Sequence, residues 1–71
     1  MTTQALAPHQ QRVVDEKADL DKRATALSQF IGCNPLFQTL PEDEQKRMET
    51  QNSLQWQLSK VLGERIAAFL G

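Results

Sequence analysis

Apolar positions recur at helical spacing in two long stretches of the chain, with a short connector between them. In the first stretch, residues 10–31, the recurring positions are alternately four and three residues apart, which is the spacing of a helix face that packs against another helix. They are Val13, Lys17, Leu20, Ala24, Leu27 and Ile31. Lys17 is the one polar member of this row. The pattern predicts an amphipathic helix with a cation in its packing face.

The second stretch runs from Pro41 to about Leu70 and carries a broader apolar stripe. At 100° per residue, one face collects Met48, Leu54, Leu58, Val61, Leu62, Ile66 and Phe69, with Gln51, Gln55 and Arg65 among them. Trp56 falls on the opposite side, near Ser59, Gly63 and Ala67. A large ring among small residues is typical of a packing surface. We therefore expect this side of the helix, with Trp56 and its small neighbours, to contact another subunit.

Turn signals separate the two stretches. Gly32 is expected to end the first helix in the left-handed conformation, and Asn34 precedes Pro35 and is biased away from helix. Beyond them, the apolar connector residues are expected to close that end of the structure: Leu36, Phe37 and Leu40. Pro41 suits the start of the second helix.

We therefore predict an all-α fold, an antiparallel two-helix hairpin. Residues 1–7 carry no periodic pattern and are predicted to be a flexible arm. The hairpin domain spans residues 8–71, with a helix over about 8–30, a turn over 31–40 and a helix over about 41–70.

Length then changes the picture, because a chain of 71 residues buries little apolar surface and usually needs a disulfide, a metal or partner subunits. The single Cys33 cannot form an intramolecular disulfide. His9 and Cys33 are too few for a zinc site, so no metal is expected. Oligomerisation is the remaining route to stability, and we predict a homo-oligomer.

Charge and motifs exclude several classes of function. The formal net charge of −1 leaves no broad basic surface, so a DNA-binding module is not expected. The chain has no apolar run that could span a bilayer and no signal-peptide pattern, which predicts a cytoplasmic protein. It also lacks nucleophile–base sets and glycine-rich phosphate loops. We predict that it is not an enzyme and needs no cofactor.

Lys17 and Arg65 admit two interpretations each. Lys17 either sets the register of a helix interface or binds an anionic ligand. Arg65 either pairs with a nearby glutamate, Glu16 or Glu64, or also binds an anionic ligand. Burying a cation without a partner costs several kcal/mol, and ligand phosphates would supply that partner. On the outer face, Arg12 with Glu16 and Asp19 with Arg23 stand four apart and are expected to pair.

Residues spread over about 8–70 resemble a known family of small phage proteins. They are His9–Val13, Glu16, Leu20, Leu27, Phe30, Ile31, Phe37, Leu40, Pro41 and Val61–Ile66. The pattern resembles the anti-CBASS sponges of bacteriophages, which share their hairpin with one group of anti-Thoeris sponges.

This resemblance implies a function. Members of that family interlock into dimers, three of which assemble into a hexamer. They bind cyclic dinucleotides, and some bind cyclic trinucleotides, in pockets between protomers. They sequester these second messengers in the host cytoplasm without cleaving them, which keeps the host's defence effector switched off.

The resemblance also implies site residues. The first-helix role in base stacking falls on Lys17, which cannot stack as an aromatic ring does, so Phe30 and Phe37 are the alternatives. Arg65 resembles a cation that gathers around a symmetry axis to hold a larger cyclic ligand. The candidate ligand-binding residues are Arg12, Lys17, Gly32, Cys33, Asn34 and Arg65. The competing hypothesis is a small helical protein–protein interaction module or inhibitor without a nucleotide ligand.

Overall fold

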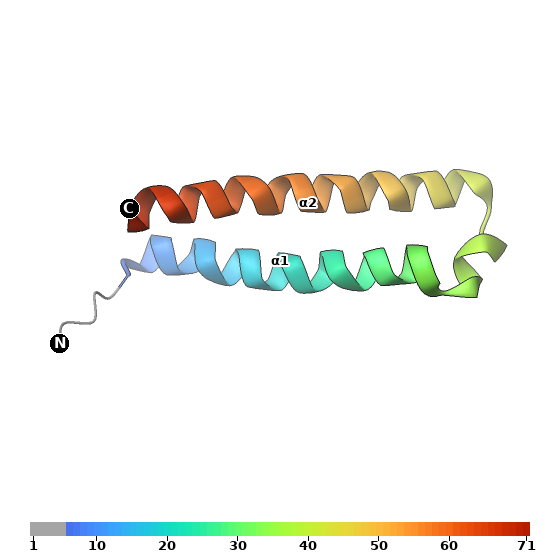
Figure 1. Cartoon of the computed structure of the whole chain (residues 1–71), viewed down its shortest axis with the longest axis horizontal. Coiled ribbons are helices and arrows are strands. Elements are labelled where there is room, and N and C mark those ends of the chain that lie inside the picture. The colour runs from blue at the N-terminus through green and yellow to red at the C-terminus, as the bar shows by residue number, and fades with distance from the viewer. Residues whose placement is uncertain (1–5) are drawn as a thin grey trace.

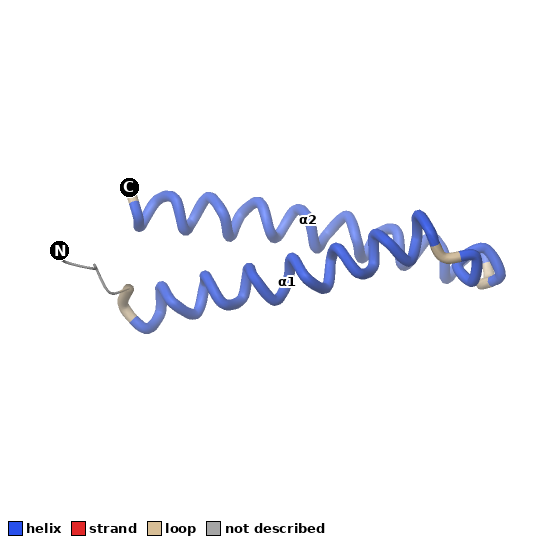
Figure 2. The backbone as a smooth tube through the Cα atoms, turned by 60° about the horizontal axis from the view of Figure 1, so that its bottom comes forward, coloured by secondary structure: helices blue, strands red, loops and turns tan. Residues whose placement is uncertain are grey.

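The computed structural model describes residues 6–71 as two antiparallel helices joined by a short 3-10 helix (Figure 1). Helix α1 spans Pro8–Cys33, the 3-10 helix η1 spans Pro35–Thr39, and helix α2 spans Glu42–Leu70. The molecule is a rod of 54 × 18 × 16 Å. In the turned view, the two helices cross near the connector (Figure 2). The predicted all-α hairpin is confirmed, and its assembly into an oligomer stays a prediction.

The start of α1 is held by backbone and side-chain caps. The Ala7 carbonyl accepts the N–H groups of Gln10 and Gln11, each at 2.9 Å. In return, the Gln10 Oε1 atom accepts the Ala7 N–H at 2.9 Å. Pro8 occupies the first turn, where its missing N–H is not needed.

The end of α1 differs from the prediction for Gly32. The helix continues through Gly32 to Cys33, and no glycine among residues 6–71 has a positive φ. The prediction of a left-handed Gly32 is therefore wrong. Asn34 ends the helix instead, with φ −91° and ψ 121°. The steric restriction that Pro35 places on the residue before it accounts for this extended backbone.

The connector closes one end of the rod with Phe37, which is buried, and Leu40, which is half-buried. The Asn34 side chain accepts the Leu36 N–H at 2.9 Å, which starts the 3-10 helix. Phe37 is 6% exposed and meets Phe30 edge-on, with 6.2 Å between ring centroids. Leu36 is 62% exposed, so the expectation that it helps to close this end is wrong.

The predicted packing face of α1 is confirmed by its burial. Val13 and Ala24 are buried, and the remaining members of the row are half-buried. Across the described chain, the buried hydrophobic residues are Val13, Ala24, Phe37 and Leu62. A core this thin leaves much of the apolar surface in water.

The face that α2 turns toward α1 contains part of the predicted apolar stripe: Met48, Leu62, Ile66 and Phe69. Its less exposed residues recur at alternating steps of four and three: Met48, Asn52, Gln55, Ser59, Leu62, Ile66 and Phe69. Leu54, Leu58 and Val61 are 58%, 43% and 49% exposed. The prediction that these three residues belong to the packing face is wrong. Asn52 and Ser59, which form hydrogen bonds to α1, lie in that face instead.

Within residues 6–71, neither helix is long and apolar enough to cross a membrane. The same part of the chain contains no group of three or more His, Cys, Asp or Glu side chains that could hold a metal ion.

Candidate functional site

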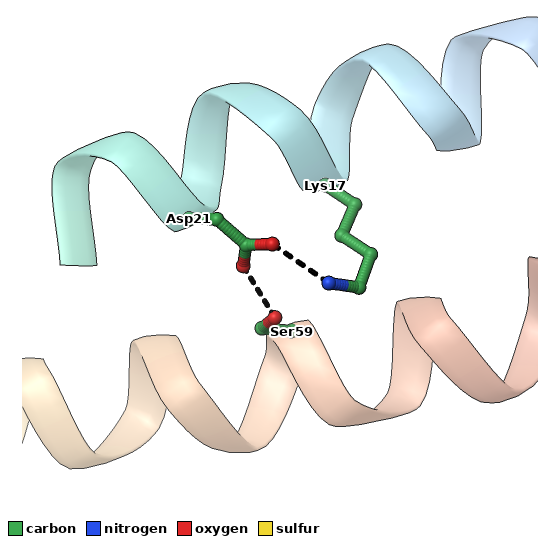
Figure 3. Close-up of polar contacts among 3 residues, drawn as sticks. All are labelled: Lys17, Asp21 and Ser59. Carbon is green, nitrogen blue, oxygen red and sulfur yellow. Dashed lines mark hydrogen bonds and ion pairs between the residues drawn. The ribbon is translucent and has the colours of Figure 1, made fainter. Parts of the chain in front are cut away.

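Lys17 belongs to a polar cluster at the centre of the hairpin. Its Nζ atom lies 2.7 Å from Oδ2 of Asp21, one turn along α1. The Ser59 hydroxyl of α2 donates to the other oxygen of the same carboxylate (Figure 3). Asp21 therefore joins the two helices. Its carboxylate is the anionic partner that the Lys17 ammonium needs in the packing face of α1. The interpretation of Lys17 as a cation without a protein partner is wrong.

The cluster lowers the pKa of the Asp21 carboxyl. The hydrogen bond from Lys17 is the largest cause, followed by the hydrogen bond from Ser59 and by the charge of Lys17. Desolvation acts in the opposite direction and is outweighed. Asp21 is thus a carboxylate at neutral pH.

Gly63 makes room for the stem of Lys17 on the facing helix. A Cβ atom added at Gly63 would lie 3.3 Å from Cε of Lys17. Lys17 is accordingly packed against α2 along its stem, with its charged end turned to Asp21. The helices are in register with Lys17 beside Gly63 and Asp21 beside Ser59.

A second polar cluster, which the sequence did not predict, joins the helices nearer the connector. The Asn52 amide donates to the Ala24 carbonyl at 3.0 Å, and the Ser28 hydroxyl donates to Oδ1 of Asn52 at 2.7 Å. The Trp56 indole N–H donates to Ser28 Oγ at 3.0 Å. Trp56 therefore contacts α1 of its own chain, while 41% of its surface stays exposed. The predicted contact of this side of α2 with another subunit stays a prediction. The four-and-three spacing that includes Asn52 and Ser59 was the signal that could have predicted polar contacts between α2 and α1.

At the connector, Cys33 and Asn34 lie beside a shallow hollow of about 470 Å³. The hollow is lined by Ala26, Gln29, Phe30, Cys33, Asn34 and Pro35. The Cys33 thiol is exposed, and so is Gly32 in the last turn of α1. Asn34 already uses its side-chain oxygen for the Leu36 N–H, which leaves its amide N–H groups for another acceptor.

Arg12 and Arg65 are exposed near the other end of the rod, where α1 begins and α2 ends (Figure 1). Neither forms an ion pair with any described residue, so the expected pairing of Arg12 with Glu16 is not present. The expected pair of Asp19 and Arg23 is confirmed, at 2.9 Å. Of the six candidate residues, these arginines are the cations without an anionic partner in residues 6–71.

The six candidate residues lie in two parts of one protomer. Lys17 is in the same half as Arg12 and Arg65, because it packs beside Gly63, two positions before Arg65. Gly32 comes fifteen positions after Lys17 on α1, which is about 22 Å at the rise of an α-helix. The hollow at the connector brings together only Cys33 and Asn34 from the set. A pocket that combined these places would have to include residues of a second protomer.

The comparison with protein families decides the family. A family model described as Sequestin matches residues 7–68, which include nearly all of both helices and the whole connector. The chain belongs to the Sequestin family. No curated protein and no solved structure matches this Sequestin chain. The family's name indicates sequestration, which means that a molecule is bound and held rather than converted.

Proposed function

We propose that this Sequestin protein is a phage-encoded sponge for cyclic di- and trinucleotide second messengers. It holds them between protomers in the host cytoplasm without cleaving them, and so blocks the host's anti-phage signalling. The observation that carries the proposal is the Sequestin match over residues 7–68. The resemblance of the same region to the anti-CBASS sponges specifies the class of ligand.

The exposed apolar row of α2 supports a site shared between protomers. Leu54, Leu58 and Val61 leave about half of their surface in water on one hairpin. Covering such side chains contributes roughly 25 cal/mol for each Å² of apolar area removed from water. A second protomer against this row would add to the thin core of each hairpin.

The charges of one protomer favour the arginines as phosphate ligands. Lys17 and Asp21 form a pair with no net charge, so a phosphate would first have to displace Asp21. Arg12 and Arg65 are exposed, and a guanidinium binds phosphate oxygens through two parallel hydrogen bonds. In this proposal the arginines hold the phosphates of the ligand. Lys17 also contacts the ligand, and it does so as a member of the polar cluster with Asp21 and Ser59.

Isothermal titration of the purified protein tests the proposal. The panel consists of cyclic di-AMP, cyclic di-GMP, cyclic GMP–AMP, a cyclic tri-AMP and cyclised ADP-ribose. A cyclic di- or trinucleotide is expected to give saturable heat and a fixed number of ligands per protomer. If none of the panel gives heat, the sponge proposal is wrong.

The exposed row of Leu54, Leu58 and Val61 also favours the second candidate function, a helical module that binds another protein. An amphipathic face of this kind is a common peptide- or helix-binding surface. The two functions differ in the titration, because the interaction module has no nucleotide ligand.

A further inference from the structure

A shallow groove of about 510 Å³ runs between the helices next to the connector. It is lined by Arg23, Ala26, Leu27, Phe30, Met48, Gln51 and Gln55. Ala26 and Phe30 also line the hollow beside Cys33 and Asn34, so the two depressions are neighbours. The volume lies within the range of about 300–1,000 Å³ that small-molecule sites occupy.

Phe30 is the aromatic ring available in this groove. It is half-buried, and the buried Phe37 supports it edge-on from the connector. Phe37 itself is 6% exposed and has no free face for a ligand. Trp56 does not line the groove, and its indole N–H is bound to Ser28. A base that entered between the helices would therefore meet the ring of Phe30.

Two carboxamides stand across the groove from Phe30, on α2. Gln55 accepts a hydrogen bond from the Asn52 amide at 3.3 Å through its Oε1 atom, which fixes the side chain and leaves its N–H groups to donate. Gln51 is exposed, so both its oxygen and its N–H groups are accessible. Glutamine pairs with the donor and acceptor edge of a purine, and adenine offers the best match.

A cation stands at the rim of the groove. Arg23 pairs with Asp19 at 2.9 Å, and the two side chains are 72% and 59% exposed. An exposed pair of this kind is held weakly, because water competes for both charges. When a base lies in the groove, a phosphate on its ribose can therefore replace Asp19 as the partner of the Arg23 guanidinium.

We propose that this groove binds a purine base of the sequestered cyclic nucleotide. The base stacks on Phe30, its edge pairs with Gln51 and Gln55, and Arg23 holds the adjoining phosphate. The inference rests on the proposed function and adds residues that the sequence did not single out as ligands: Arg23, Gln51 and Gln55. It also assigns the stacking role to Phe30 rather than to Lys17.

Titration of Phe30→Leu with cyclic di-AMP, cyclic GMP–AMP and cyclic tri-AMP tests the stacking. Loss of one stacked base is expected to weaken binding about 5- to 150-fold. Phe30→Tyr keeps the ring and should bind as the unchanged protein does. The matched control is Phe69→Leu, the same kind of change on a half-buried ring near the other end of the rod, with affinity expected within twofold.

Gln51→Leu tests the base edge independently, because Gln51 is exposed and its loss leaves the packing of the hairpin intact. Binding of the adenine-containing nucleotides should weaken by about fivefold or more. The exposed Gln57→Leu is its control.

The outcomes separate this inference from the proposed function. If the unchanged protein gives saturable heat and Phe30→Leu and Gln51→Leu bind with the same affinity as it does, the groove proposal is wrong and the sponge proposal is unaffected. Equal losses in the variants and their controls also overturn the groove. Absence of heat from the unchanged protein with the whole panel overturns both.

Discussion

Lys17 shows how far a single residue could be interpreted from spacing. Its place in the packing face of α1 was predictable, because the alternation of four and three residues includes it. Its partner Asp21 was not predicted, although the two are four residues apart, because Asp21 is not a member of the apolar row. The structure places Asp21 at the edge of the interface, where Ser59 of α2 reaches it. That contact depends on the register of two helices, which no spacing within one helix specifies.

The lowered pKa of Asp21 predicts a pH-dependent contribution to stability. A carboxyl whose pKa is lower in the folded state stabilises the fold above its unfolded pKa, and this contribution is lost as pH falls through the lowered folded pKa. Asp21→Asn should therefore lower the melting temperature most at neutral pH. The gap to the unchanged protein should close as the solution is acidified.

Thermal melts followed by circular dichroism between neutral and acidic pH measure this gap. Asp15→Asn is the control, since Asp15 accepts a hydrogen bond from Gln11 of its own helix and is exposed. If the difference in melting temperature between Asp21→Asn and the unchanged protein stays constant at every pH, the polar cluster does not stabilise the Asp21 carboxylate.

At the scale of the helix, the packing face of α1 was predicted, and that of α2 was predicted in part. Apolar residues of α1 follow one row, so spacing and hydrophobicity agree. In α2 they diverge, because Leu54, Leu58 and Val61 make an exposed row beside a packing face that includes Asn52 and Ser59. Hydrophobicity correctly selected Met48, Leu62, Ile66 and Phe69, and it wrongly added the exposed row. Asn52 and Ser59 complete the packing face because they form hydrogen bonds that join the helices.

The hydrogen bond between Trp56 and Ser28 predicts energetic coupling between the two helices. Trp56→Phe and Ser28→Ala should each lower the free energy of unfolding, by about 0.5–1.5 kcal/mol for the lost hydrogen bond. The double variant should lose less than the sum of the two, because both changes remove the same bond.

Urea denaturation of the four proteins of this cycle measures the coupling. Gln57→Ala combined with Ser28→Ala is the control pair, since Gln57 is exposed and bonds to Ser53 of its own helix. Strict additivity for Trp56 and Ser28 would mean that the ring is free for another subunit, as the sequence alone indicated.

At the scale of the whole molecule, the hairpin and the family could be predicted from the sequence. Two long periodic stretches and a connector with turn residues specify the hairpin, and residues along its length resemble the sponge family. The grouping of the candidate residues could not be predicted, because it depends on which faces meet. The candidate residues of the connector lie toward one end of a rod 54 Å long, and Lys17 and the two arginines lie in the other half.

The exposed row of α2 predicts where a second protomer binds. Leu58→Lys should shift the protein toward smaller species in sedimentation velocity, because it would bury a charge in an apolar contact. Its helical circular dichroism should stay unchanged, since Leu58 is 43% exposed in one hairpin. Gln57→Lys adds the same charge beside it at an exposed position and should sediment like the unchanged protein. Equal sedimentation of Leu58→Lys and the unchanged protein would place the contact elsewhere.

Native mass spectrometry of the protein with the cyclic nucleotide that gives the largest heat tests the central claim most directly. A sponge with shared pockets should carry the nucleotide at its unmodified mass on dimers or larger assemblies, with single protomers free of it. Nucleotide retained on single protomers, or recovered as cleavage products, would contradict the account.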